Sequence, residues 1–178
     1  ELRGKMRPIG ELHPALQNRY LVKHWLDRGT TSVVFGESNV GKTFFALDVA
    51  IHVAAGVSWR GNRVHGNGEH VFFLAAEGGF GINNRLAAIR HRNPDLFSKA
   101  QGNLSIIPTT IDLKGGVDAG SISSAILNKS NTGASLIVID TLARSMGIGD
   151  ENSSQDMGAV IRNIDKIRTA TGAHVMII

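Results

Sequence analysis

Eight consecutive residues have the types and spacing of a phosphate-binding loop, G-x-x-x-x-G-K-[ST]. In such a loop the glycines let backbone N–H groups approach an anion closely. The lysine supplies a charge for the β- and γ-phosphates, and the final hydroxyl is a ligand for Mg²⁺. The pattern therefore predicts a site for ATP and Mg²⁺. Its residues are Gly36, Glu37, Ser38, Asn39, Val40, Gly41, Lys42 and Thr43.

Two acidic residues farther along the chain each follow an apolar run of strand type. Asp140 closes the run 136–140, and we expect it to hold Mg²⁺ together with Thr43. An aspartate in that place can also cap a helix or a turn. Glu77 follows the run 70–76 and precedes two glycines, so it is a candidate to polarise the water that attacks the γ-phosphate. The alternative for Glu77 is an exposed loop residue, and with Lys42 it completes the predicted catalytic set.

The loop can bind phosphate only if a strand precedes it and a helix begins directly after it. Residues 31–35 are an apolar, β-branched run, and residues 44–55 have helical spacing that predicts Phe44, Leu47, Ile51 and Ala54 in the core. Further apolar runs alternate with helical patterns, which predicts a three-layer α/β/α fold around a mainly parallel sheet. The phosphate loop, Glu77 and Asp140 should then share the carboxyl edge of the sheet.

The remaining elements follow from the same patterns. Residues 19–22 are predicted to form a short edge strand, and 24–28 a turn of helix. A capping box at Ser153 opens the last helix, which is expected to bury Val160, Ile161, Ile164 and Ile167. The other predicted strands are 70–76, 104–107, 136–140 and 173–178, and the other predicted helices are 78–92, 118–129 and 153–171.

Composition narrows the class of protein. The 178 residues are 42% hydrophobic and 19% charged, which predicts a globular core at 19–178 preceded by an arm or linker at 1–18. The chain has no cysteine, which excludes disulfides and thiolate metal sites. No run reaches the ~20 apolar residues of a membrane span, so we expect a cytoplasmic protein without a membrane partner. The net charge of +4 favours nucleic acid only mildly. Because the chain ends within the run 173–178, we expect the core to be truncated at its C-terminal end.

Three segments together resemble the RecA-like ATPases: 36–43, 75–78, and 136–144 followed by 149–153. The likeness is closest to RepA-type plasmid replicative helicases and related phage and mobile-element AAA ATPases, over about residues 20–178. This resemblance implies a RecA-like P-loop NTPase core in a hexamer, with Mg-ATP at subunit interfaces and single-stranded DNA in a central pore. It makes Glu77 the general base, makes Asp140 the magnesium-associated acid and places 145–152 near the pore, with Arg144 as a DNA contact. The family's sensor histidine and neighbour-reaching arginine would follow Ile178.

Two other functions share the phosphate loop: a small-molecule kinase, and a nucleotide-dependent assembly scaffold without motor activity. Such kinases usually carry an arginine-rich lid after the loop helix, where this chain has only Arg60 and Arg63. A separate group of three arginines has no role assigned by the motif. We expect it to be a solvated helix face, or else an interface or DNA patch. It comprises Arg85, Arg90 and Arg92.

Overall fold

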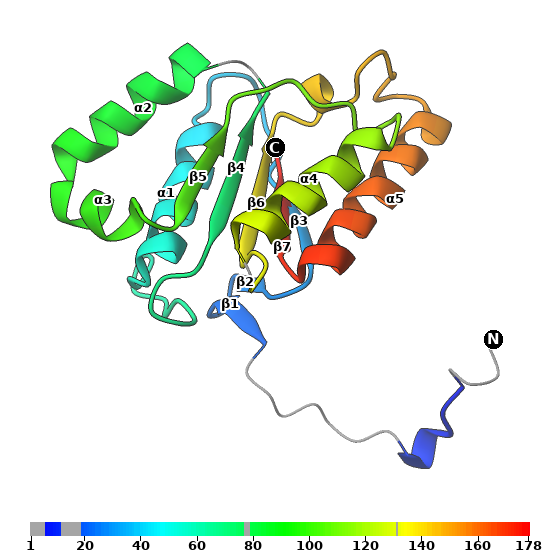
Figure 1. Cartoon of the computed structure of the whole chain (residues 1–178), viewed down its shortest axis with the longest axis horizontal. Helices are drawn as coiled ribbons and strands as arrows, with labels where there is room; N and C mark the ends of the chain where they lie inside the picture. Colours follow the sequence, from blue (N-terminus) through cyan, green and yellow to red (C-terminus); the bar gives the residue numbers. More distant parts are fainter. Residues whose placement is uncertain (1–5, 12–18, 77–78, 131) are drawn as a thin grey trace.

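The computed structural model describes residues 6–11, 19–76, 79–130 and 132–178 (Figure 1). A short 3-10 helix at Ile9–Glu11 precedes the folded core, and a second, η3, lies at Ala143–Ser145. The strands are β1 (Tyr20–Val22), β2 (Leu26–Asp27), β3 (Thr31–Val33), β4 (Val71–Ala75), β5 (Leu104–Ile107), β6 (Leu136–Asp140) and β7 (His174–Ile177). The helices are α1 (Lys42–Ala55), α2 (Gly79–Arg92), α3 (Pro94–Ala100), α4 (Val117–Lys129) and α5 (Ser154–Thr171).

Five of the strands form one parallel sheet in the order β3-β7-β6-β4-β5. The predicted parallel sheet is thus confirmed. Because all its strands run the same way, the segments that follow β3, β4, β6 and β7 leave from one edge. That edge is where ligands bind in sheets of this kind.

Helices cover both faces of this sheet, as Figure 1 shows. Successive strand residues point to opposite faces, so Phe73 packs with α1 and α3 whereas Phe72 and Leu74 pack with α4 and α5. All residues of β4 and β6 are buried, which explains why their sequences are continuously apolar rather than alternating. The three-layer α/β/α architecture is therefore confirmed.

The predicted turn of helix at 24–28 is wrong. Residues 23–25 form the turn of an antiparallel hairpin that joins β1 to β2. The Trp25 amide donates to the Val22 carbonyl at 2.9 Å, and His24 adopts a positive φ of 69°. A residue with a positive φ does not fit a right-handed helix, so the chain reverses here instead of coiling.

Two side chains expected in the core lie at the surface. Phe44 is 50% exposed and Ile161 is 52% exposed, whereas their neighbours Phe45 and Val160 turn inward. Helix α3 was not predicted at all. It begins after Asn93, whose side chain accepts a hydrogen bond from the Leu96 amide at 3.2 Å.

Helix α1 ends, and helix α5 begins, at residues that commonly cap helices. Helix α1 stops at Gly56, which has a φ of 65° and packs against the backbone of Asn67 and Gly68, so a Cβ has no room there. Helix α5 begins at the predicted cap, where Ser153 Oγ accepts from the Asp156 amide at 3.3 Å. Among the helices that the structure describes, none combines the length and the apolar character needed to cross a bilayer.

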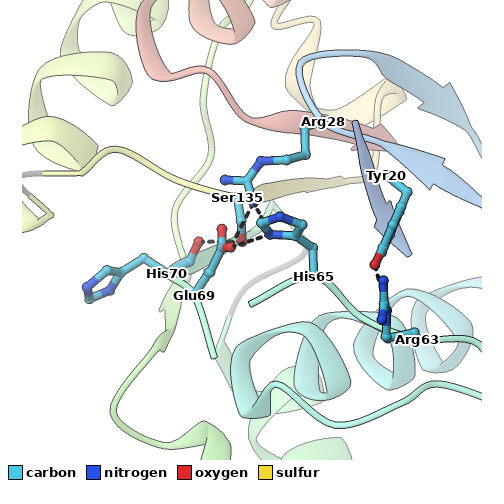
Figure 2. A network of polar contacts seen from close by, with 7 residues as sticks. All are labelled: Tyr20, Arg28, Arg63, His65, Glu69, His70 and Ser135. Carbon is cyan, nitrogen blue, oxygen red and sulfur yellow. Dashed lines mark hydrogen bonds and ion pairs between the residues drawn. The ribbon is translucent and has the colours of Figure 1, made fainter. Parts of the chain in front are cut away.

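A polar network anchors the connection between α1 and β4 at the amino edge of the sheet (Figure 2). Arg28 Nη1 donates to Glu69 Oε1 at 2.7 Å, and His65 Nδ1 lies 3.2 Å from the same oxygen. Burial raises the pKa of Glu69, but hydrogen bonds and charge from Arg28 and His65 outweigh burial and leave that pKa below its ordinary value. Nearby, Arg63 Nε donates to the Tyr20 hydroxyl at 2.6 Å. The network lies at the end of the sheet opposite the phosphate loop.

Candidate functional site

The phosphate-binding sequence lies between β3 and α1, as its chemistry requires. Three of its residues have a positive φ, which is 154° at Gly36, 66° at Asn39 and 94° at Gly41. Gly41 caps the N-terminus of α1, and its carbonyl accepts from the Phe45 amide at 3.0 Å. The loop therefore leads directly into the positive end of a 14-residue helix, which favours an anion.

Lys42 folds back across its own loop. Its Nζ donates to the Gly36 carbonyl at 2.7 Å and to the Glu37 carbonyl at 2.8 Å. The ammonium group thus lies where the loop curves, with its hydrogens directed at neutral carbonyl oxygens. A phosphate oxygen would be a stronger acceptor for the same hydrogens because it is charged.

A cavity of about 260 Å³ opens beside this loop at the carboxyl edge of the sheet. It brings together most of the predicted site residues, namely five of the eight loop residues and Asp140 from β6. Gly36 and Glu37 contact Lys42 through their carbonyls, and Val40 is an exposed residue of the loop. The lining consists of Ser38, Asn39, Gly41, Lys42, Thr43, Phe44, Arg85, Asp140, Thr141 and Ile178.

Asp140 is only 4% exposed, at the last position of β6. Its carbonyl accepts from the Ala76 amide at 2.8 Å, which fixes the strand end beside β4. The peptide bond that follows, to Thr141, is cis. The Thr141 carbonyl in turn accepts from the Ser145 amide and hydroxyl, at 3.1 Å and 2.9 Å, so η3 holds this turn in place.

The donor set suits a hard cation. Mg²⁺ in nucleotide sites is bound by one or two protein oxygens, and phosphate oxygens and water complete its shell. Thr43 and Asp140 supply a hydroxyl and a carboxylate to the same cavity. Among the described residues, no group of three His, Cys, Asp or Glu side chains forms a metal site without a ligand's help.

Two predicted residues come from outside the phosphate loop and β6. Glu77 lies outside the described residues. Arg144 is an exposed residue of η3 and is not among the residues that line the cavity.

Four lining residues were not predicted as site residues: Phe44, Arg85, Thr141 and Ile178. Phe44 was expected in the core, and Arg85 on a solvated face of α2 or in an interface or DNA patch, yet both contribute to the cavity wall. The order of elements in the sequence could have indicated Arg85, because α2 follows β4 and therefore starts at the carboxyl edge of the sheet. Its early turns are thus close to the phosphate loop.

Comparison with known families settles the class of this chain. A family model described as an AAA domain matches residues 8–178. The chain belongs to this AAA domain family. The comparison of the chain with curated protein sequences found no match.

Solved structures show the fold of this AAA domain. A crystal structure of the RadB recombinase is similar with a TM-score of 0.54 and 17% identity, over 84% of this chain and 60% of that one. A KaiC-like protein from the hyperthermophilic archaeon Pyrococcus horikoshii is similar with a TM-score of 0.56 and 17% identity, over 88% and 64%. The AAA domain described here has a RecA-like fold and spans less than two thirds of each of these chains.

Proposed function

We propose that this AAA domain binds Mg-ATP in the cavity beside the phosphate loop and that the protein hydrolyses it. The observation that carries the proposal is that Lys42, Thr43 and Asp140 line one cavity at the carboxyl edge of the sheet. The loop and the N-terminus of α1 would hold the phosphates. Thr43 and Asp140 would hold Mg²⁺, which when bound neutralises charge on the β- and γ-phosphates.

Binding requires Lys42 to exchange its partners. In the structure its Nζ donates to the carbonyls of Gly36 and Glu37. The phosphates would replace these neutral acceptors with negatively charged ones, which bind the ammonium group more strongly. Glu77 remains our candidate for the general base. Its place in the sequence, two residues after Ala75 at the end of β4, supports that role because β4 and β6 end side by side.

Two variants separate binding from turnover. Lys42→Ala should weaken ATP binding by at least about tenfold, because it removes the charged contact to the phosphates. Glu77→Gln should keep binding but stop hydrolysis, because an amide cannot accept the water proton. Binding is measured by titration calorimetry with Mg-ATP, and hydrolysis by phosphate release from the natural full-length protein.

A matched control is Lys99→Ala, which removes the same charge from an exposed position of α3. It should leave both measurements unchanged. If a folded Lys42→Ala protein binds ATP as the unmodified protein does, the nucleotide site is wrong. If Glu77→Gln hydrolyses ATP at the normal rate, Glu77 is not the base.

We further propose that the whole protein is a DNA helicase or recombination motor of a plasmid, phage or mobile element and acts as a hexamer. The resemblance to RepA-type helicases supports this, and so does the fold that the chain shares with a structure named as a recombinase. Its net charge of +4 has the sign that DNA requires.

The kinase alternative has less support from the structure. The two arginines after the loop helix are engaged away from the cavity. Arg60 lies 3.7 Å from Asp48 Oδ2 and stacks on the Trp59 ring, and Arg63 is bonded to Tyr20 (Figure 2). They follow the C-terminal end of α1, whereas the phosphate loop precedes its N-terminal end, so they do not form a lid.

A further inference from the structure

Two side chains of the cavity wall, Phe44 and Arg85, have no role in the function proposed above. Phe44 follows Thr43 directly in the first turn of α1, and half of its surface is exposed. Arg85 belongs to the second turn of α2. Single exposed apolar side chains are common on protein surfaces, so what distinguishes Phe44 is the side chain that its ring contacts in this wall.

The side chain that the Phe44 ring contacts is Arg85. The Arg85 guanidinium carbon lies 5.8 Å from the centre of the Phe44 ring, within the range of a cation–π contact. This contact joins α1 to α2, the two helices that contribute these side chains to the cavity wall. Within the described part of the chain, no carboxylate forms an ion pair with Arg85, so the ring is its principal contact there.

The direction of the Arg85 side chain follows from helix geometry. Side chains of a helix lean toward its N-terminus, and the N-terminus of α2 lies at the carboxyl edge of the sheet. In agreement, Arg85 Nη1 passes over Gly81, where a Cβ would lie 3.5 Å from it. The guanidinium therefore leans toward the edge at which the phosphate loop ends.

We propose that Phe44 and Arg85 form one unit of the nucleotide site, in which the ring holds the guanidinium in place to bind the terminal phosphate of a nucleoside triphosphate. The inference rests on the proposed function, because it assigns one end of the same ligand. A guanidinium presents a planar fork that matches two phosphate oxygens. Arg85 is then a binding residue, and Phe44 is a positioning residue.

The charges of the cavity support this assignment. Lys42 comes from the loop side and Arg85 from the α2 side, so two cations line a cavity that also contains Asp140. A nucleoside triphosphate with one Mg²⁺ bound still carries enough negative charge to interact with both Lys42 and Arg85. Because Phe44 adjoins Thr43, the residue expected to reach the metal and phosphates, its ring keeps Arg85 at the phosphate end of the ligand.

The first test compares Mg-ATP with Mg-ADP by titration calorimetry. Arg85→Ala should weaken ATP binding by about tenfold or more and ADP binding much less, because one charge-assisted contact to the terminal phosphate is lost. Arg85→Gln, which keeps most of the side-chain volume, should give the same change in the ATP:ADP affinity ratio. It serves as the second variant if the alanine protein does not fold.

Arg90→Ala is the matched control. Arg90 lies on the same helix and makes the same kind of contact, with its guanidinium carbon 5.7 Å from the Phe97 ring, but it does not line the cavity. This control removes one charge and one cation–π contact. The ATP:ADP affinity ratio of the control should equal that of the unmodified protein.

The second test measures the coupling between the two residues. Phe44→Leu removes the ring face and should lower the ATP:ADP ratio several-fold, whereas Phe44→Tyr keeps the ring and should restore it. In the Arg85→Ala background, Phe44→Leu should cause no further change in the ratio, because the residue it positions is already absent.

The outcomes separate this inference from the proposed function. If Lys42→Ala binds ATP normally, the nucleotide site itself is wrong. If binding depends on Lys42 while Arg85→Ala and Arg85→Gln keep the normal ATP:ADP ratio, only the role of Arg85 is refuted. Additive effects of Phe44→Leu and Arg85→Ala would refute the positioning role of Phe44.

Discussion

His174 is a buried histidine that links β7 to the segment before and within β3. Its Nδ1 lies 2.8 Å from the Asp27 carbonyl, and its Nε2 lies 2.8 Å from the Ser32 hydroxyl. The carbonyl can only accept, so Nδ1 carries the proton and Nε2 accepts from Ser32. Burial lowers the pKa of His174, and the hydrogen bond to the Asp27 carbonyl and the charge of Asp27, which raise that pKa, do not compensate. The neutral ring is therefore the form that the fold favours.

This histidine makes stability depend on pH. In the unfolded chain it takes up a proton near its ordinary pKa of 6.5, whereas in the folded protein it resists protonation. Its contribution to stability is present above that pKa and is lost as the pH falls through the window below it. We expect the free energy of unfolding, measured with urea, to fall between about pH 7.5 and about pH 5.5.

Two substitutions isolate this effect from that of the other histidines. His174→Gln should reduce the loss of stability over this pH window, although it lowers stability at neutral pH. His91→Gln, at an exposed position of α2, should leave the pH dependence unchanged. An unaltered pH dependence in His174→Gln would show that another group is responsible.

At the scale of elements, α5 depends on its N-terminal cap. Ser153 Oγ accepts from the Asp156 amide, and Asp156 Oδ2 accepts from the Asp150 amide at 3.0 Å and from Lys114 Nζ at 2.9 Å. Ser153→Ala should lower the free energy of unfolding by about 0.5–2 kcal/mol, because an amide of the first turn loses its acceptor. Urea unfolding measures the change.

The neighbouring serine gives the comparison for this prediction. Ser154→Ala alters an exposed side chain one residue later, inside the helix, so its effect should be small. Equal losses in the two variants would mean that the cap does not stabilise α5 as described.

The elements also show what the sequence could predict. Strands β4 and β6 were recognised because both of their faces are covered, which leaves a continuous apolar run. The choice between Phe44 and Phe45 could not be made in the same way, because either one fits the helical spacing. The structure decides it, since Phe45 packs edge-on against the buried Trp59, with ring centres 5.7 Å apart.

In the candidate site, too, some residues could be predicted from the sequence and others could not. The phosphate loop and Asp140 lie on local patterns, so the sequence alone brought them to one cavity edge. Arg85 could not be found in this way, because its place in the wall depends on how α2 packs beside α1. Such a packing arrangement has no short sequence signature.

At the scale of the whole molecule, we expect DNA binding to require assembly. A single chain has a net charge of only +4 and thus few phosphate contacts, whereas a ring multiplies them. The natural full-length protein should form ATP-dependent oligomers that bind single-stranded DNA, with affinity falling as salt rises. Sedimentation and fluorescence anisotropy at several salt concentrations measure both properties.

Arg144, exposed on η3, is the residue through which this prediction can be checked. Arg144→Ala should weaken DNA binding and leave ATP affinity unchanged, and Arg92→Ala on the exposed end of α2 is the control for lost charge. Tight DNA binding by a monomer of residues 1–178 would contradict this account. An oligomer indifferent to DNA would contradict it equally.

The order of strands has a consequence for how the protein is made. In the described sheet β3, which delivers the phosphate loop, pairs only with β7, and the contact between Thr30 and His174 spans 144 positions. At about 5–20 residues per second, a ribosome needs roughly 7–30 s to synthesise the chain between them. During that interval the nascent chain carries the complete phosphate-binding sequence without the neighbour that positions it. The proposed nucleotide site is therefore completed only late in the synthesis of the chain.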